Sequence, residues 1–100
     1  MATYQILYWR HIPLSVRATD EQGTVSRALT GRFEAALRKD TANYTAVMHS
    51  SSFSYGRKRE RAGAAAEVAM AIVQELTENW DEAAALASFN RGELYTDKWG

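Results

Sequence analysis

Histidine and cysteine are the side chains most often found at metal and nucleophilic sites, and this sequence is poor in both. His11 and His49 are its only histidines, and it has no cysteine. The spacings HxH, HxxxH and HExxH, which place two imidazoles on one metal ion, are absent. A chain without cysteine forms no disulfide, thiolate nucleophile or cysteine-ligated metal site of its own. We therefore expect no metal site and no cofactor.

Three serines, residues 50–52, directly follow His49. A serine nucleophile needs a base within hydrogen-bond reach and a third group that orients this base. Adjacent side chains of a strand point to opposite faces, so Ser51 is the serine that shares a face with His49. No GxSxG turn accompanies them. The pattern favours a polar strand or loop over a hydrolase site, and we expect no enzyme activity.

The segment YQILYWRHIPLSV, residues 4–16, places two polar side chains after a bulky run. Bulky residues in both alternating sets predict a strand over residues 3–9 that is covered on both faces or paired centrally. Pro13 has no amide hydrogen and keeps the preceding residue extended, which predicts a connection or bulge over residues 10–13. The candidate binding residues at this strand end are Trp9, Arg10 and His11.

A basic stretch, RKRERA, lies between Gly56 and Gly63 and precedes a helical pattern. It is not a Walker A motif, which needs Gly-Lys followed by Ser or Thr. The positive pole of a helix N-terminus disfavours these cations, and a bound anion would relieve the repulsion. The alternative is a solvated loop whose charges keep the preceding strand from aggregating. The candidate anion-binding residues are Arg57, Lys58, Arg59 and Arg61.

Aromatic side chains on a sheet beside a basic loop are typical of proteins that bind single-stranded nucleic acid. Tyr4, Tyr8 and Trp9 of the first strand could supply such a surface. However, no RNA-recognition sequence is present, and an acidic C-terminal half would repel phosphates. Nucleic-acid or polyanion binding is therefore the alternative function.

The first half of the chain predicts a hairpin and a helix. Residues 14–19 alternate between apolar and polar side chains, and the turn sequence DEQG favours a return strand over residues 24–28. Thr30 is a candidate cap for the helix that follows. Its apolar stripe consists of Phe33, Ala36 and Leu37.

The second half predicts one strand and two helices. Residues 44–55 favour one long or interrupted strand. A long helical pattern without proline follows the basic stretch. Asp81 can cap a shorter helix that runs through Phe89 and ends near Gly92. The apolar stripe of the long helix consists of Ala65, Val68, Ala69, Ile72, Leu76 and Trp80.

These elements predict an α+β fold in a single small domain, residues 1–92. Their order is βββαβα with a short C-terminal helix. An antiparallel sheet of about four strands would pack two main helices on one face and so bury the apolar residues of both. Residues 93–100 form a C-terminal tail that docks or frays.

The charges are balanced overall but unevenly distributed. The chain has 12 basic and 12 acidic side chains, and the excess of basic residues before position 62 is matched by an excess of acidic residues after it. No run approaches the ~20 apolar residues of a membrane span, and no signal-peptide pattern opens the chain. We expect a cytoplasmic protein that does not contact the membrane.

Three stretches of the sequence resemble a small bacterial domain family labelled "virulence factor". The resemblance implies no enzyme activity, and it suggests an accessory or interaction role. The matching residues are Tyr8, Trp9, Arg10, Ile12, Pro13 and Val16, then Leu29, Arg32 and Phe33, and then residues 64–81.

The resemblance adds Arg32 to the candidate binding residues beside Arg10. Guanidinium groups at both positions could bind a carboxylate, a phosphate or the backbone of a partner. The alternative is an ion pair within the chain, for instance with Glu34. The leading interpretation is a non-catalytic accessory or protein-interaction module. Its three Trp, five Tyr and three Phe also suggest a homodimer, because a thin core conceals limited aromatic surface.

Overall fold

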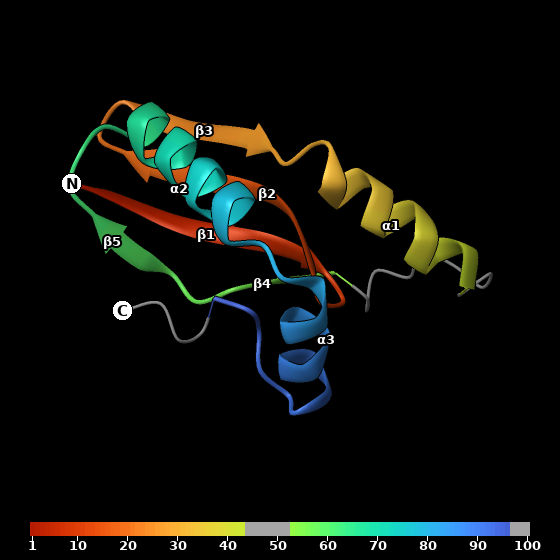
Figure 1. Cartoon of the computed structure of the whole chain (residues 1–100). Coiled ribbons are helices and arrows are strands. Elements are labelled where there is room, and N and C mark those ends of the chain that lie inside the picture. Colours follow the sequence, from red (N-terminus) through yellow and green to blue (C-terminus); the bar gives the residue numbers. More distant parts are fainter. Residues whose placement is uncertain (44–52, 97–100) are drawn as a thin grey trace.

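The computed structural model describes residues 1–43 and 53–96 of the chain. These residues form one antiparallel sheet and three helices (Figure 1). The strand order is β3-β2-β1-β4, and β5 also pairs with β1. The predicted α+β fold class is confirmed. The strands are β1 (Ala2–Trp9), β2 (Ile12–Asp20), β3 (Gly23–Ala28), β4 (Phe53–Tyr55) and β5 (Arg59–Arg61), and the helices are α1 (Arg32–Asn43), α2 (Ala65–Asn79) and α3 (Glu82–Asn90).

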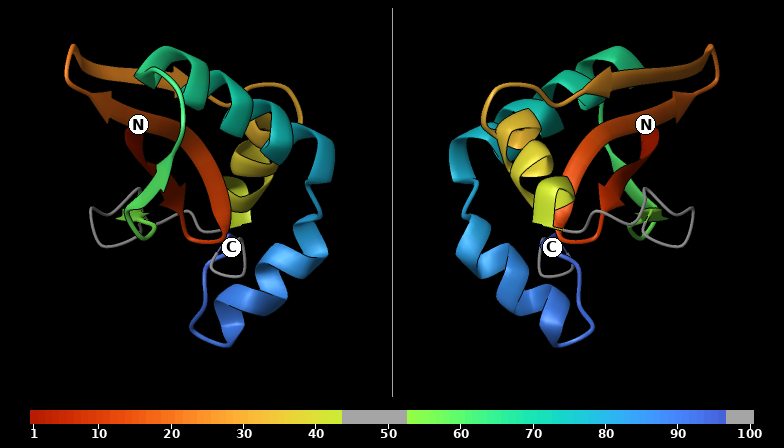
Figure 2. Two further views of the ribbon diagram at one scale, coloured as in Figure 1. Left: turned by 90° about the vertical axis from the view of Figure 1, so that its left-hand side faces the viewer. Right: turned by 90° about the vertical axis from the view of Figure 1, so that its right-hand side faces the viewer.

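Helix α2 covers one face of the sheet and contacts β1, β2 and β3. Figure 2 shows the helices on one side of the strands. The buried strand residues alternate along β1 and β2, as a half-covered sheet requires. The predicted helical stripe is also confirmed, with Trp80 packed against it and partly buried. The main core contains Tyr4, Ile6, Tyr8, Val16 and Ala18 of the sheet and Ala65, Val68, Ala69, Ile72 and Leu76 of α2.

Strand β1 has neighbours along both of its edges, which confirms the predicted central pairing. β2 pairs along one edge, while β4 and β5 pair with the two halves of the other. Between β4 and β5, the amide of Gly56 donates to the carbonyl of Ile6 at 2.8 Å. A Cβ at Gly56 would lie 3.3 Å from the ring of Tyr8. The chain therefore approaches β1 closely at a position that favours glycine.

The β1–β2 hairpin is tighter than the sequence predicted. Its turn consists of Arg10 and His11, and β2 already begins at Ile12. Of the connection or bulge predicted over residues 10–13, the connection takes only Arg10 and His11, while Pro13 lies in β2 beside a bulge or irregularity in the pairing. Pro13 pairs with Tyr8 where the pairing register shifts. A proline fits a strand at such a bulge because the hydrogen-bond ladder is already interrupted there.

The prediction of a loop over residues 57–61 is wrong for its second half. Arg59–Arg61 forms β5, in which Arg59 pairs with Tyr4 and Arg61 with Ala2. Paired residues of neighbouring strands share a face, so both arginines lie on the side that α2 covers. β5 forms because the edge of β1 is free to pair there. The pairing gives hydrogen-bond partners to backbone N–H and C=O groups that would otherwise bind only water.

The strand predicted over residues 44–55 is described only at its end. Residues 53–55 form β4, which pairs with the C-terminal part of β1. Residues 44–52 lie outside the described part of the chain. His49 and the serines at 50–52 belong to that segment.

The first four residues of the predicted tail dock on the sheet. Leu94 and Tyr95 pack against the main core, and Thr96 is buried. The hydroxyls of Tyr8 and Thr96 are hydrogen-bonded, and the amide of Thr96 donates to the Tyr8 oxygen at 3.3 Å. Arg59 donates from Nη2 to the carbonyl of Thr96 at 2.9 Å. Residues 97–100 lie outside the described part of the chain.

Three aromatic rings join α1, the α2–α3 junction and the C-terminal segment. The ring centres of Phe33 and Trp80 are 5.0 Å apart, and those of Trp80 and Tyr95 are 5.3 Å apart. Such tilted pairs stabilise a structure beyond the area they bury. The Tyr95 hydroxyl donates to the carbonyl of Asn79. Burial raises the pKa of Tyr95 above its ordinary value, so the hydroxyl keeps its proton at neutral pH.

Asp20 joins the β2–β3 turn to the start of α2. Its Oδ1 accepts from the amides of Gln22 at 2.7 Å and Gly23 at 3.2 Å. Its Oδ2 accepts from the amide of Ala65, also at 2.7 Å. Helix α2 has no side-chain cap at its own cap residue, Ala64, so Asp20 satisfies one of its first amides from another element. The hydrogen bond from Ala65, followed by the one from Gln22, lowers the pKa of Asp20.

Candidate functional site

The β1–β2 turn holds its first residue in an unusual backbone conformation. Arg10 has a φ of 53°, in the left-handed region that favours glycine. Holding a residue with a Cβ in this region costs about 1–3 kcal/mol. The pairing of Trp9 with Ile12 on either side of the turn imposes the conformation. The fold therefore holds Arg10 in a backbone conformation that a residue with a side chain disfavours.

The guanidinium of Arg10 lies between two aromatic rings from distant parts of the sequence. Its central carbon is 6.0 Å from the ring centre of Trp9 and 5.4 Å from that of Phe89 in α3. Aromatic faces attract cations at such distances. These contacts bring the β1–β2 turn and α3 into one surface.

Trp9 and His11, on either side of Arg10 in the sequence, are buried beneath this surface. Trp9 is 1% exposed and His11 is 4% exposed. The His11 ring centre is 6.4 Å from that of Phe89, with the planes tilted by 50°. Arg10, by contrast, is partly exposed. Of the three residues predicted at this strand end, Arg10 is therefore the one that reaches the surface.

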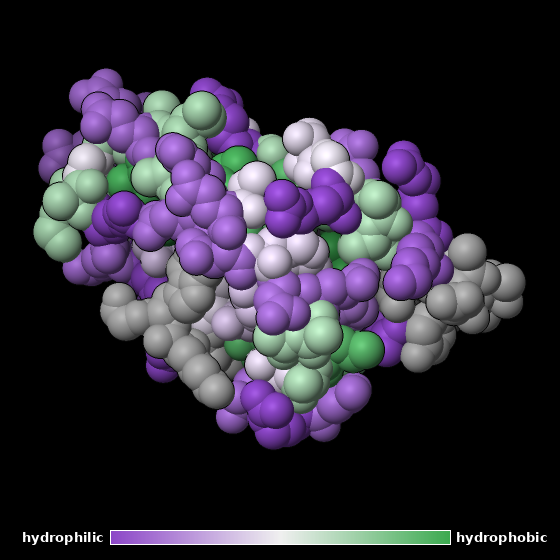
Figure 3. Space-filling model, in the orientation of Figure 1, coloured by the Kyte–Doolittle hydropathy of each residue, from purple (hydrophilic) through white to green (hydrophobic). Residues whose placement is uncertain are grey.

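Helix α3 presents an apolar outer face next to Arg10. Ala85 and Ser88 point inward and are buried, while Leu86 is 38% exposed. Glu82 is the single charged residue of the helix. Figure 3 shows apolar side chains over the part of the molecule where Figure 1 places α3. We call this surface the α3 patch, and it consists of Arg10, Ala83, Leu86, Ala87 and Phe89.

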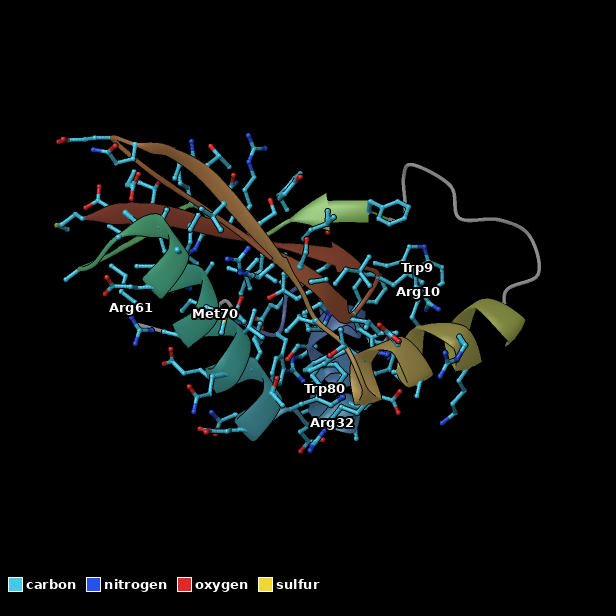
Figure 4. The ribbon with its side chains drawn as sticks, turned by 90° about the horizontal axis from the view of Figure 1, so that it is seen from above. Trp9, Arg10, Arg32, Arg61, Met70 and Trp80 are labelled. Atoms are coloured by element: carbon cyan, nitrogen blue, oxygen red, sulfur yellow. The ribbon has the colours of Figure 1, made fainter. Side chains whose placement is uncertain are left out.

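Arg32 lies at a different place from Arg10, so the structure does not bring the two predicted arginines together. Figure 4 shows Arg32 beside Trp80 and apart from Trp9 and Arg10. The residue lines a hollow of about 270 Å³ between α1 and the start of α3. Lys39 and Glu82 also line this hollow, and their charged groups are 3.9 Å apart.

The predicted anion-binding residues are also divided. Arg59 is engaged by the carbonyl of Thr96, and Arg61 forms an ion pair with Glu75 of α2. Arg57 and Lys58 remain exposed in the link between β4 and β5. The basic run is therefore not one cationic surface, because strand pairing turns two of its arginines toward the α2 side.

The aromatic first strand does not offer a surface for stacking bases. Tyr4, Tyr8 and Trp9 are all buried. Tyr4 and Tyr8 face α2, and Trp9 packs in a second small core with Ile12 and Ala36. The prediction of an aromatic nucleic-acid-binding face is wrong for this reason. Among the aromatic residues that the structure describes, Tyr55 alone is exposed, and the homodimer stays a prediction.

A comparison with protein families assigns the chain to one of them. A family model described as "Virulence factor" matches residues 7–87. The chain belongs to the virulence factor family. The resemblance drawn from the sequence is thus confirmed. Comparisons with curated proteins and with solved structures gave no match.

This member of the virulence factor family also has a polar surface that the sequence did not predict, and two of its residues, Thr3 and Gln5, precede the matched range 7–87. This open face of the sheet lies opposite α2 and carries the alternate residues of the same strands. In the strand register, Thr3 pairs with Thr19, and Gln5 pairs with Arg17. Lys58 joins them around a hollow of about 200 Å³. The alternation of residues 14–19 predicts the solvent-facing side of β2. It does not predict that residues of β1 and Lys58 lie next to that side.

Two further features of this virulence factor family member concern metals and membranes. Within residues 1–43 and 53–96, no group of three or more His, Asp or Glu side chains is placed to hold a metal ion. None of the helices in these ranges combines the length and the apolar character that crossing a membrane requires.

Proposed function

We propose that this member of the virulence factor family is a non-catalytic interaction module whose protein partner docks on the α3 patch. The observation that carries the proposal is the apolar outer face of α3, with Leu86 exposed at its centre. A helix that is apolar on all sides is normally buried, so the outer face of α3 is suited to burial by a partner.

Arg10 gives the patch a polar and directional component. Its guanidinium stacks on Phe89, which neighbours Leu86 on the helix because the two are three residues apart. Arginine and aromatic side chains are enriched at protein interfaces, and Arg10 and Phe89 supply both types here. A partner that pairs a carboxylate with an apolar side chain would match this arrangement. The left-handed conformation of Arg10 sets the position of the guanidinium before the partner arrives.

The burial of His11 supports a non-catalytic role. An imidazole that acts as a general base must reach the proton it removes, directly or through one water molecule. His11 is instead packed beneath the turn against Phe89. The proposal gives His11 and Trp9 the task of holding Arg10 in place.

Affinity capture with matched variants tests the proposal. The full chain, Leu86→Asp and Arg10→Ala are used as baits in extracts of the native cell, with Met70→Asp as the control. Met70 is 57% exposed on α2, and Figure 4 shows it far from Arg10. We expect at least one protein to be retained by the wild type and by Met70→Asp but lost from Leu86→Asp. The purified partner should then bind Leu86→Asp at least about tenfold more weakly, as for an interface hot spot.

Two results would contradict the proposal. One is equal retention of all captured proteins by the wild type and by Leu86→Asp. The other is a dimer that forms through the α3 patch, seen as a concentration-dependent mass that Leu86→Asp abolishes. In that case the patch would be occupied by a second copy of the chain instead of a different protein.

A further inference from the structure

The open face of the sheet contains a polar hollow that the α3 patch does not include. It is lined by three residues of β1, two of β2 and one from the link between β4 and β5. Its volume is about 200 Å³, which is enough for one small ionic group and part of the molecule that carries it. The lining residues are Thr3, Tyr4, Gln5, Arg17, Thr19 and Lys58.

Arg17 and Lys58 give this hollow a positive charge. Both side chains are exposed, and in the described part of the chain neither forms an ion pair or hydrogen bond. Other cations of the same region are engaged, since Arg59 binds a carbonyl and Arg61 binds Glu75. Arg17 and Lys58 are therefore available to a ligand from solution.

Neutral polar groups surround the two cations. The hydroxyls of Thr3 and Thr19 lie on paired positions, and Thr19 shares a hydrogen bond of 3.0 Å with Thr24. The Gln5 side chain lies opposite Arg17 and donates from Nε2 to the carbonyl of Gly56 at 3.2 Å. The hollow thus combines two cationic groups with hydroxyls that can donate to an anion.

We propose that this hollow binds a single phosphoryl group carried by a small molecule or a side chain. A phosphate monoester has a charge near −2 at neutral pH and three terminal oxygens. It matches two cations and two hydroxyls better than a carboxylate does, because a carboxylate has one charge and two oxygens. Arginine binds phosphate through a fork of two parallel donors, and lysine binds it as a point charge.

The acids around the hollow argue against a long polyanion. Glu60 pairs with Thr3 on the same face, and Glu21 is exposed in the β2–β3 turn just beyond Thr19. A nucleic-acid strand running along this face would bring its phosphates close to these carboxylates. One compact dianion between Arg17 and Lys58 avoids that repulsion.

Amide chemical shifts of the full chain provide the test. The protein is titrated with inorganic phosphate and with phosphoserine, and sodium chloride at equal ionic strength serves as the reference. We expect saturable shifts of the amides of Thr3, Gln5 and Thr19 that chloride does not produce. Arg17→Gln and Lys58→Gln should each weaken binding about tenfold, the scale of one charge-assisted contact.

Arg27→Gln is the matched control. Arg27 is an exposed arginine of the same sheet, but it pairs with the buried Val16 and so belongs to the other face. It should bind phosphate as the wild type does. Shifts that follow ionic strength alone, or equal binding by Arg17→Gln and the wild type, would overturn the proposal. Tighter binding of a single-stranded oligothymidylate than of phosphoserine would also overturn it, because the face would then bind an extended polyanion.

Discussion

The two faces of the sheet are made by alternate residues of the same strands, yet they differ in almost every property. On the covered face, Tyr4, Ile6 and Val16 pack beneath α2 and are buried. On the open face, Thr3, Gln5 and Arg17 surround a polar hollow. The covered face thus holds the main core, whereas the open face carries the polar hollow for which we propose a ligand. The period of two along a strand makes such a division possible.

The largest expected loss of stability comes from a substitution on the covered face. Leu76→Ala removes a fully buried side chain of α2 and should lower the free energy of unfolding by about 2–5 kcal/mol. Leu7→Ala on the open face is the matched change, and it should cost clearly less because Leu7 is partly exposed. Urea denaturation of both variants measures the difference. Equal losses would show that the open face contributes to the core as much as the covered one.

A smaller effect is expected where the C-terminal segment docks on the covered face. Tyr8→Phe removes the hydroxyl that is hydrogen-bonded to Thr96 and should cost about 1 kcal/mol. Hydrogen exchange at the Thr96 amide should also become faster. Tyr55→Phe serves as the control, because Tyr55 is 50% exposed. Unchanged exchange at Thr96 in Tyr8→Phe would mean that this hydrogen bond does not hold the segment.

A difference of similar size in the free energy of unfolding is expected at the turn between β1 and β2, where it arises from backbone conformation alone. Arg10→Gly and Arg10→Ala both remove the guanidinium, but only glycine adopts a φ of 53° without strain. Arg10→Gly should therefore be more stable than Arg10→Ala by about 1 kcal/mol in thermal or urea unfolding. Equal stability of the two variants would show that the turn relaxes when the side chain is shortened.

The smallest effect should be the pH dependence from Asp20, which joins the β2–β3 turn to the covering helix. Its pKa in the folded protein is below the ordinary value of 3.8, so its charged form stabilises the fold above that pH. This contribution is lost as the pH falls through the lowered pKa. Asp20→Asn keeps one acceptor oxygen and should be less stable than the wild type at pH 7.

Unfolding curves of the wild type and Asp20→Asn at several pH values test this prediction. The difference between them should shrink below pH 3.8, where the wild type also loses its charge. A difference that stays constant down to pH 2 would mean that geometry, and not charge, explains the role of Asp20.

Much of the covered face could be predicted from the sequence. The spacing of Val68, Ile72 and Leu76 indicates one buried stripe, and the alternation along residues 14–19 indicates one buried strand face. These patterns are local, because a helix or strand repeats its orientation every few residues. The Asp20–Gly23 turn was predictable for the same reason, since its residue types suit a tight hairpin.

The candidate sites were predicted less well because they join residues that are distant in the sequence. Arg10 was selected as a binding residue, but its contact with Phe89 depends on how α3 packs. Arg17 and Lys58 belong to different elements and were not linked at all. For Arg59 and Arg61 the sequence predicts a loop, because the order of residues does not reveal that the edge of β1 is free to pair with them.

The sequence by itself determined the fold class, the helix that covers the sheet and the family to which the chain belongs. These follow from hydrophobic periodicity and from short motifs, which operate within a few residues of each other. Only the tertiary structure decided which arginines are engaged, that the aromatic residues of β1 are buried, and that α3 and Arg10 share one surface. Strand pairing and helix packing bring distant side chains together, and a one-dimensional pattern does not specify those contacts.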